Sequence, residues 1–386
     1  MKQEFDMKQE FDLDPDVIYL NHAAVAPWPT RTARAVADFA EQNRRFGAWH
    51  YPDWLRVEAR LREHLAALVG APSADDIALL KNTSEALSVI AAGLDWRAGD
   101  NIVSFAGEFP SNRIVWEALA GQGVRLRLAD SGATDPEAAL IACCNADTRL
   151  VSISSVQYAS GLRIDLGRIG DYCNARGILL CVDAIQSLGA LPFDVLAVGA
   201  DFVVADGHKW MLGPEGLALF YSRPAARDKL RLHQFGWHMV EHVGDFDRSD
   251  WQPADSARRF ECGSPNMLAI HALEASLSLL LEIGVATLSE RIADNTRSML
   301  DHIDRRGFEL LSPRQPSRRS GIVTFRVPGT ESQRLYEALM KQGVVCACRG
   351  GGVRFSPHFH TPPEQIGAAF DRIDALLAGK TLVGSE

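Results

Sequence analysis

The stretch Asp201-Phe-Val-Val-Ala-Asp-Gly-His-Lys209-Trp-Met-Leu-Gly-Pro-Glu-Gly216 places one lysine in a glycine-flanked turn directly after an apolar strand. Lysine is rare in this chain, and arginine carries most of the positive charge. A partly desolvated lysine amine has a lowered pKa and can attack an aldehyde to form a Schiff base. An ordinary surface lysine in a loop is the alternative, and the rest of the chain has to decide between them.

The length and composition of the chain limit the classes of protein to which it can belong. The chain has 386 residues, of which 47% are hydrophobic and 23% charged, as expected for a globular enzyme with one large and one smaller domain. A net charge of −9 without a basic run argues against nucleic acid as a partner. The most apolar window is interrupted by Glu274 and Glu282, so no membrane span is expected.

The N-terminal sequence and the cysteines indicate in which cellular compartment the protein is expected. Met-Lys-Gln-Glu-Phe-Asp occurs twice, at 1–6 and 7–12, and this polar start is unlike a signal peptide. Seven cysteines without paired CxxC motifs favour reduced thiols over disulfides or a metal site. We therefore expect a cytoplasmic protein without a bound metal.

Between about residues 60 and 225, short apolar runs alternate with helical patterns. This alternation predicts an α/β fold with a large, doubly wound, mostly parallel sheet, in which ligands bind at the carboxyl ends of the strands. The predicted strands are 77–80, 101–105, 125–128, 150–154, 179–182, 202–205 and 217–221, and the predicted helices are 84–94, 113–122 and 169–176.

The alternation of strand and helix patterns ends after residue 225. Residues 226–262 are irregular, and a helical pattern then runs from about Met267 to Arg306. The remainder predicts a small α+β domain with strands 321–327, 344–348 and 353–356 and helices 332–342 and 363–377. We thus expect an N-terminal tail (1–17), a large domain (18–262), a linking helix (263–306) and a small C-terminal domain (307–386).

Two groups of polar residues follow predicted strands of the large domain. Asn82, Thr83 and Ser84 stand where a strand passes into a helix, and hydroxyls with free backbone amides at a helix N-terminus suit a phosphate; simple helix capping is the alternative. Asp183 ends another strand, with Gln186 three residues later. A carboxylate there can hold a proton on a pyridine nitrogen and make the ring an electron sink, or it can merely cap a turn.

Two further residues complete the set. Phe109 follows a strand and can stack on a flat cofactor ring, although a core phenylalanine is the common alternative. Arg354 lies on a strand of the small domain and can bind a carboxylate through two hydrogen bonds, unless it forms a surface ion pair. Together with Lys209, these residues are the parts of a pyridoxal phosphate enzyme that acts on an amino acid.

At this point the chain resembles the class V aminotransferase family of fold-type I pyridoxal phosphate enzymes. It looks closest to the branch that holds selenocysteine lyases, cysteine desulfurases, kynureninases and isopenicillin N epimerases. The resemblance runs from Ile18-Tyr-Leu-Asn-His-Ala-Ala24 to the last helix, and it is most specific at His208-Lys209 with Gly213-Pro-Glu-Gly216, at Asp183-x-x-Gln186 and at Arg259-Phe-Glu-Cys-Gly-Ser-Pro-Asn266.

The resemblance implies roles for individual residues. Lys209 would bind the cofactor and later carry the Cα proton, Asp183 would pair with the pyridine nitrogen, and Gln186 would approach the ring hydroxyl. The phosphate would be held by Thr83, His208 and the backbone of 82–84. Ser264 would reach the phosphate of a partner subunit, which implies a homodimer with shared active sites. Arg354 would bind the substrate α-carboxylate.

Three departures from the family pattern matter. Phe109 stands where desulfurases place a histidine. No cysteine lies between Arg349-Gly-Gly-Gly352 and Val353, where desulfurases carry their nucleophile; Cys346 and Cys348 fall on the preceding strand and are expected to be structural thiols. Asp206 replaces a serine, and its carboxylate would be unfavourable beside a phosphate, so its orientation stays open.

These observations predict an enzyme that removes the Cα proton of an amino acid and cleaves its Cβ–sulfur or Cβ–selenium bond. An epimerase or aminotransferase on the same scaffold is the runner-up, and a non-catalytic sulfur-transfer partner is the third possibility. The polar residues considered for steering the reaction, with His22 and Gln157 preferred, are His22, Gln157, Tyr158, His238, His358 and His360.

Overall fold

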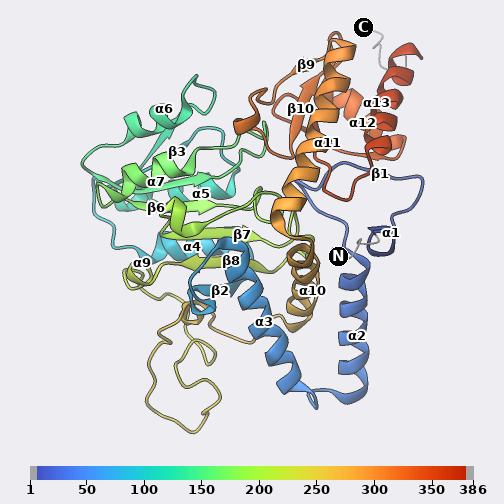
Figure 1. Cartoon of the computed structure of the whole chain (residues 1–386). Helices are drawn as coiled ribbons and strands as arrows, with labels where there is room; N and C mark the ends of the chain where they lie inside the picture. Colours follow the sequence, from blue (N-terminus) through green and yellow to red (C-terminus); the bar gives the residue numbers. More distant parts are fainter. Residues whose placement is uncertain (1–6, 380–386) are drawn as a thin grey trace.

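The computed structural model describes residues 7–379, so the first copy of the duplicated hexapeptide lies outside the described part of the chain. A large domain built on a twisted sheet sits beside a smaller α+β domain, and two long N-terminal helices flank the large domain (Figure 1). The predicted fold class is confirmed.

The large sheet has seven strands in the order β2-β8-β7-β6-β5-β3-β4. All neighbouring pairs are parallel except those of β8, which runs antiparallel to β2 and β7. The strands lie within one to two residues of the predicted positions: β2 (Ile77–Leu80), β3 (Asn101–Phe105), β4 (Arg125–Ala129), β5 (Thr148–Ser154), β6 (Leu179–Asp183), β7 (Phe202–Asp206) and β8 (Ala218–Ser222). β5 to β8 are almost wholly buried, as expected for strands covered on both faces.

Helices cover both faces of this sheet and form two separate apolar clusters with it. Neighbouring strand residues alternate between the clusters: Val103 and Val203 belong to one, and Ile102 and Phe202 to the other. The helices of this region are α4 (Thr83–Gly93), α5 (Ser111–Glu117), α6 (Pro136–Cys143), α7 (Leu166–Asn174), α8 (Val195–Val198) and α9 (Pro224–Arg227), with short 3₁₀ turns at 74–76, 118–122 and 257–260.

The predicted single linking helix is wrong. The helical stretch consists of α10 (Met267–Ile283) and α11 (Val285–Arg306), which meet at Gly284 with a bend of 84°. Gly284 has φ 87° and ψ 127°, a backbone conformation that ends a helix and that residues with a Cβ adopt rarely. α10 packs on α2 (Thr30–Phe46) and α3 (Tyr51–Val69), whereas α11 reaches the small domain.

The small domain contains a four-stranded antiparallel sheet in the order β12-β13-β10-β9. Its strands and helices are β9 (Glu309–Leu310), β10 (Val323–Arg326), β12 (Ala347–Arg349), β13 (Gly352–Phe355), α12 (Ser332–Lys341) and α13 (Pro363–Ala378), with a 3₁₀ turn at 316–318. The predicted strand 344–348 is divided: β11 (Val344–Val345) leaves this sheet and pairs in parallel with β1 (Ile18–Tyr19). Ile18 and Leu20 therefore belong to the core of the small domain, although we expected the large domain to begin at residue 18.

The N-terminal segment is packed against the rest of the chain. Glu10, at the end of the short α1 (Met7–Glu10), forms an ion pair with Arg31 at 2.7 Å. The ring of Phe11 stacks on that of His360 with 3.6 Å between their centroids. The described part of the predicted tail thus contributes contacts to both helix α2 and the small domain.

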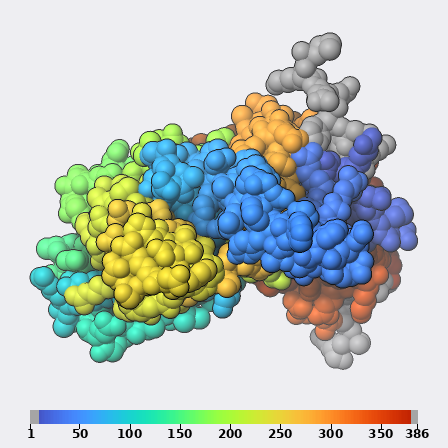
Figure 2. Space-filling model, turned by 90° about the horizontal axis from the view of Figure 1, so that it is seen from below, coloured from blue at the N-terminus to red at the C-terminus, as the bar shows by residue number. Residues whose placement is uncertain are grey.

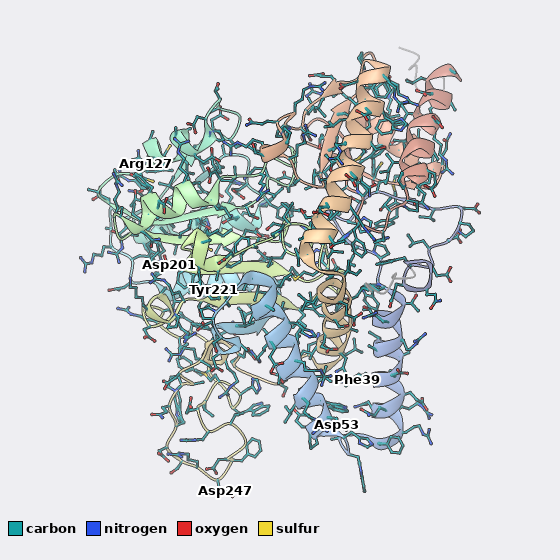
Figure 3. The ribbon with its side chains drawn as sticks, viewed as in Figure 1. Phe39, Asp53, Arg127, Asp201, Tyr221 and Asp247 are labelled. Carbon is teal, nitrogen blue, oxygen red and sulfur yellow. The ribbon has the colours of Figure 1, made fainter. Side chains whose placement is uncertain are left out.

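One irregular segment, at about 231–256, projects from the large domain. Asp247 marks its far end, whereas Asp201 and Tyr221 lie in the region of the sheet (Figure 3). Seen from below, this segment forms a lobe beside the N-terminal helices (Figure 2). Among the described residues no single helix has the length and apolar character needed to cross a membrane; α10 and α11 meet that test only as a sharply bent pair.

Candidate active site

The carboxyl ends of β2, β3, β5, β6 and β7 meet around one pocket of about 260 Å³ that also receives residues from the small domain. This is the edge at which open α/β sheets bind ligands. The pocket is lined by Ala23, Ala24, Val25, Asn82, Thr83, Ser84, Phe109, Ser111, Ser154, Tyr158, Asp183, Ile185, Gln186, Asp206, His208, Lys209, Glu215, Arg349 and Arg354. The structure thus brings together most of the residues that the sequence singled out.

Lys209 lies in the turn that follows β7. Hydrogen bonds from Leu212 N–H to the Lys209 carbonyl (3.0 Å) and from Gly213 N–H to the Gly207 carbonyl (2.9 Å) hold this turn. The lysine is 9% exposed, and burial lowers the pKa of its amine to about 8, with Asp183 opposing the shift. Nζ lies 5.5 Å from the ring centroid of Phe109. A lysine amine in this state is a competent nucleophile near neutral pH.

Asp183 ends β6 beside this lysine, and it is 3% exposed. Burial raises the pKa of its carboxyl to about 7, although a hydrogen bond from Ile185 N–H to Oδ1 (3.0 Å) acts in the opposite direction. No cationic side chain is in ion-pair contact with Asp183 among the described residues. A buried carboxyl of this kind fits a ligand that brings its own N–H⁺ group, such as a pyridinium ring.

The N-terminus of α4 supplies the anion-binding end of the pocket. Asn82 caps this helix, accepting a hydrogen bond from Glu85 N–H at 2.9 Å, so the capping interpretation is confirmed and phosphate binding stays a prediction. The Thr83 hydroxyl accepts from Asp206 N–H at 3.1 Å, and Ser84 donates to Ser111 at 2.8 Å. Free amides and hydroxyls at a helix N-terminus are the donors that a phosphate requires.

The orientation of Asp206, left open by the sequence, is defined by its neighbour. Its Oδ1 lies 3.0 Å from Nδ1 of His208, and both side chains are largely buried. Both residues line the pocket. Neither of these two atoms, Asp206 Oδ1 and His208 Nδ1, has a hydrogen-bond partner among the described residues, so a donor supplied by a ligand would be favourable here.

Gln186 lines the pocket but is held by two contacts. Its Oε1 accepts from the indole N–H of Trp210 at 2.8 Å, and its Nε2 donates to the Ala23 carbonyl at 3.0 Å. Gln186 thereby ties the residue after Lys209 to the N-terminal segment. Its expected approach to a ring hydroxyl stays a prediction.

Two arginines enter the pocket from the small domain. Arg354 is 2% exposed; its Nη1 donates to the Tyr158 carbonyl at 2.7 Å and its Nη2 to Asn21 Oδ1 at 3.3 Å, while its buried Nε has no hydrogen-bond partner. Burial lowers its pKa to about 10, and the nearby charge of Arg349 acts in the same direction. A buried guanidinium without a carboxylate calls for an anionic ligand. The sequence had not singled out Arg349 or Glu215.

Two of the predicted substrate-binding residues do not line this pocket. His22 is fully buried, with Nδ1 3.0 Å from the Ser356 carbonyl and Nε2 3.2 Å from Nε2 of His360. Gln157 donates to buried Glu108 at 2.9 Å. Both therefore support the walls of the site without facing it, because contacts distant in sequence enclose them. Tyr158, the other residue considered there, does line the pocket, with its ring edge-on to that of Phe109.

The remaining candidates lie elsewhere. Ser264 faces a separate hollow before α10, shared with Lys81, Glu85 and Gly216, so a single chain does not bring it to Lys209. His238 lies 3.6 Å from Glu261 in a buried cluster with Glu58, in which Arg62 binds both carboxylates at 2.6 Å. That guanidinium makes the cluster an ion-pair network.

The turn between β12 and β13 consists of Gly350 and Gly351 alone, because Arg349 pairs with Gly352. Both glycines have positive φ, 57° and 77°, as two-residue hairpin turns require. Cys346 and Cys348 lie on or before β12 and do not line the pocket, and burial raises the pKa of each thiol, that of Cys346 to about 12.

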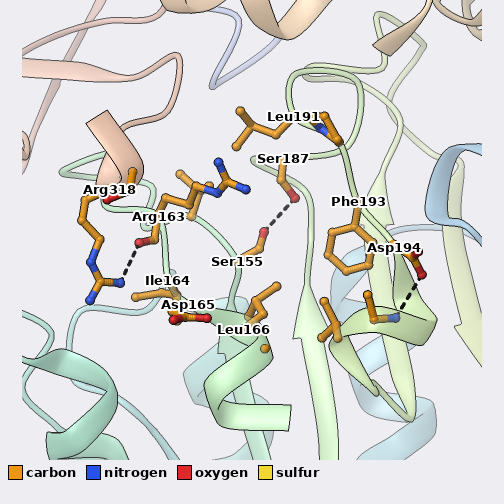
Figure 4. Close-up of a pocket in the computed structure, with 16 residues that line it drawn as sticks. Ser155, Arg163, Ile164, Asp165, Leu166, Ser187, Leu191, Phe193, Asp194 and Arg318 are labelled. Atoms are coloured by element: carbon orange, nitrogen blue, oxygen red, sulfur yellow. Dashed lines mark hydrogen bonds between the residues drawn. The ribbon is translucent and has the colours of Figure 1, made fainter. Parts of the chain in front are cut away.

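A second cavity, of about 410 Å³, is lined by neither Lys209, Asp183 nor Arg354 (Figure 4). Its wall includes Ser155 and Ser187, whose hydroxyls are 2.8 Å apart. Ser155 N–H also donates to the Asp183 carbonyl at 2.9 Å, which helps to fix the end of β6. The cavity shares no lining residue with the candidate site.

Comparisons with known proteins agree with this arrangement. The family model for aminotransferase class-V matches residues 18–359. A probable cysteine desulfurase of Methanothermobacter thermautotrophicus is 30% identical over 94% of this chain and 95% of its own length. An isopenicillin N epimerase of Streptomyces clavuligerus is 29% identical over 94% and 96%. Among solved structures, the apo cysteine desulfurase of Thermococcus onnurineus NA1 superimposes with a TM-score of 0.87 at 23% identity, covering 98% of this chain and 99% of that one.

The matched residues 18–359 include the whole pocket, from Ala23 to Arg354. This chain belongs to the aminotransferase class-V family.

Proposed function

We propose that this protein cleaves the Cβ–sulfur or Cβ–selenium bond of an α-amino acid without a cysteine of its own taking part. It is a pyridoxal phosphate-dependent enzyme. The observation that carries the proposal is the convergence of Lys209, Asp183 and Arg354 on a pocket that no cysteine of the described chain lines. Sulfur or selenium can leave Cβ directly as the sulfide or selenide anion, so no thiol of the enzyme is needed to accept it.

The pocket residues have complementary tasks in this reaction. When bound, pyridoxal phosphate supplies a ring that withdraws electrons from the Cα of an attached amino acid. Asn82, Thr83, Ser84 and His208 would hold its phosphate, and Asp183 would keep the proton on its ring nitrogen. These assignments rest on the α4 N-terminus and on the buried, unpaired carboxyl of Asp183.

The substrate is handled by the other residues of the pocket. Arg354 binds the α-carboxylate with its unpartnered Nε and one further N–H. The Lys209 amine, with its pKa near 8, takes the Cα proton and can return it later. Phe109, 42% exposed and facing Nζ, offers an aromatic surface that excludes water and carries no exchangeable proton.

The nature of Phe109 also favours elimination over epimerisation. Inverting Cα requires a proton to return to the face opposite to the one it left, and the Phe109 ring beside Lys209 Nζ cannot donate one. The epimerase or aminotransferase remains the alternative function. A purely non-catalytic sulfur-transfer role is disfavoured because Lys209, Asp183 and Arg354 are all present and close together.

Incubation of the holoenzyme with a panel of amino acids tests this proposal. Pyruvate formed together with sulfide or selenide supports the lyase. Pyridoxamine phosphate accumulation would show transamination, and loss of optical activity alone would show epimerisation. In Lys209→Ala the long-wavelength absorption of the bound cofactor should disappear; an unchanged spectrum would refute the role of this lysine.

We further propose that the enzyme is a homodimer in which Ser264 completes the partner's phosphate site, and that it works in the cytoplasm. The exposure of Ser264 in a hollow away from its own Lys209 supports the first point, and seven free cysteines support the second. Mixing inactive Ser264→Tyr and Lys209→Ala chains tests the shared site. A hybrid with one restored site should regain part of the activity, and a monomer in light scattering would contradict the dimer.

A further inference from the structure

The pocket contains one arginine more than an ordinary α-amino acid requires. Arg354 accounts for the α-carboxylate, but Arg349 lines the same pocket. Arg349 is exposed, and its Nη1 donates to the Cys348 carbonyl at 2.8 Å. Over residues 7–379, no carboxylate is in ion-pair contact with either arginine; Glu215 also lines the pocket but is not paired with them.

The β12–β13 hairpin places both guanidinium groups on one face. Arg349 pairs with Gly352 and Ala347 pairs with Arg354, so the two arginines are diagonal neighbours. Side chains two residues apart on a strand share a face, and diagonal positions lie about 7–8 Å apart. The tight glycine turn leaves no additional residue that could shift this register.

Two like charges on one face of a hairpin are unfavourable when nothing neutralises them. Here the cost falls on Arg354, whose buried charge is further disfavoured by Arg349. Within the described part of the chain, none of the acidic groups of the pocket neutralises Arg349 through an ion pair: Asp183 accepts from Ile185 N–H, Asp206 lies 3.0 Å from His208, and Glu215 is not paired with an arginine. The positive charge of Arg349 therefore faces the space that a substrate side chain would enter.

Resting on the proposed function, we propose that the substrate is a short, acidic, sulfur- or selenium-containing amino acid, whose oxyanion, on that atom or beyond it, binds Arg349 while its α-carboxylate binds Arg354. A carboxylate or a sulfinate satisfies this requirement, since both offer two oxygens to the guanidinium fork. The small pocket volume, about 260 Å³, favours a side chain of one or two carbons.

Ligand binding to the holoenzyme tests this independently of turnover. Succinate and butyrate have the same chain length and lack an amine, but only succinate has a second carboxylate. We expect succinate to raise the melting temperature of the holoenzyme more than butyrate at equal concentration. In spectral titrations, aspartate should bind more tightly than alanine, and cysteine sulfinate more tightly than cysteine. The pair with the larger difference in affinity shows whether Arg349 prefers a carboxylate or a sulfinate.

The variant Arg349→Gln should remove the preference, lowering the affinity for succinate about tenfold while leaving that for butyrate unchanged. Arg334→Gln, an exposed arginine on α12 outside the pocket, serves as the matched control and should keep the preference. Equal stabilisation by succinate and butyrate in the native protein, or an Arg349→Gln variant that still prefers succinate, would overturn the inference.

The same experiment separates this inference from the proposed function. A protein that never develops the Lys209-dependent absorption band refutes both. A holoenzyme that binds neutral amino acids through Arg354, without preference for acidic ones, refutes only the role of Arg349. A preference for acidic ligands that is lost in Arg349→Gln supports both.

Discussion

The substitution Arg354→Gln is the most direct test of substrate binding. Arg354 is almost fully buried, its Nη1 and Nη2 already donate to the Tyr158 carbonyl and Asn21, and its Nε has no partner. Glutamine keeps a neutral donor but loses the charge and the fork that a carboxylate matches. The expected loss is about one hydrogen bond to a charged group, about 1.5–3 kcal/mol.

This energy corresponds to an increase of about 10- to 150-fold in KM for the amino acid. Because burial already disfavours the charge of this arginine, its removal should cost little stability, and the melting temperature should stay close to that of the native protein. The absorption band of the bound cofactor should also be unchanged. Arg354 belongs to the small domain, whereas the residues proposed to contact the cofactor belong to the large domain.

The assay is steady-state kinetics across a wide concentration range, with the absorption spectrum and the melting temperature as controls. Arg354→Lys keeps the charge without the fork and should fall between the native protein and the glutamine variant. A KM within twofold of the native value in a folded, cofactor-loaded Arg354→Gln protein would refute the reasoning, and another residue would then have to hold the carboxylate.

Three further outcomes are expected. The rate at which the cofactor-free protein combines with pyridoxal phosphate should rise with pH through about 8, because only the neutral Lys209 amine reacts and its pKa is lowered to that value; a midpoint near 10.5 in stopped-flow absorbance would contradict the burial argument. Asp183→Asn should lower kcat at least about a hundredfold while Arg354-dependent binding persists, as measured by comparing KM and kcat, because a neutral amide cannot stabilise a protonated ring nitrogen. Gly284→Ala should destabilise the protein by about 1–3 kcal/mol in denaturant unfolding, since φ is 87° there, and an unchanged midpoint would show that the α10–α11 bend tolerates a Cβ.

The sequence best predicts those strands and helices whose position follows from the local pattern of apolar and polar residues. The strands of the large sheet are predicted to within two residues because most of them are apolar runs that end at a polar turn, as at Asp183 and at Asp206. Since parallel strands bring their carboxyl ends to one edge, these turns also predicted most of the pocket.

What the sequence could not show depends on contacts between distant segments. The pairing of Ile18 with Val344 joins residues more than 300 positions apart, and no local pattern signals it. His22 looks like a pocket residue until Ser356 and His360 enclose it. The helical periodicity of α10 and α11 continues through Gly284, so only a glycine at a helix end hinted at the bend.

In the proposed function, the hairpin β12–β13, rather than the Lys209 turn, decides which substrate is taken. In the roles proposed for them, Lys209, Asp183 and the α4 N-terminus would bind the cofactor and remove the Cα proton, and those steps serve a lyase, an epimerase or an aminotransferase equally. The hairpin, in contrast, determines what meets the substrate side chain. Its two-glycine turn leaves no loop that could carry a thiol, and its register puts Arg349 on the same face as Arg354. The short turn has no cysteine, and the strand before it carries a cation into the pocket, so the identity of the substrate should follow from these two features.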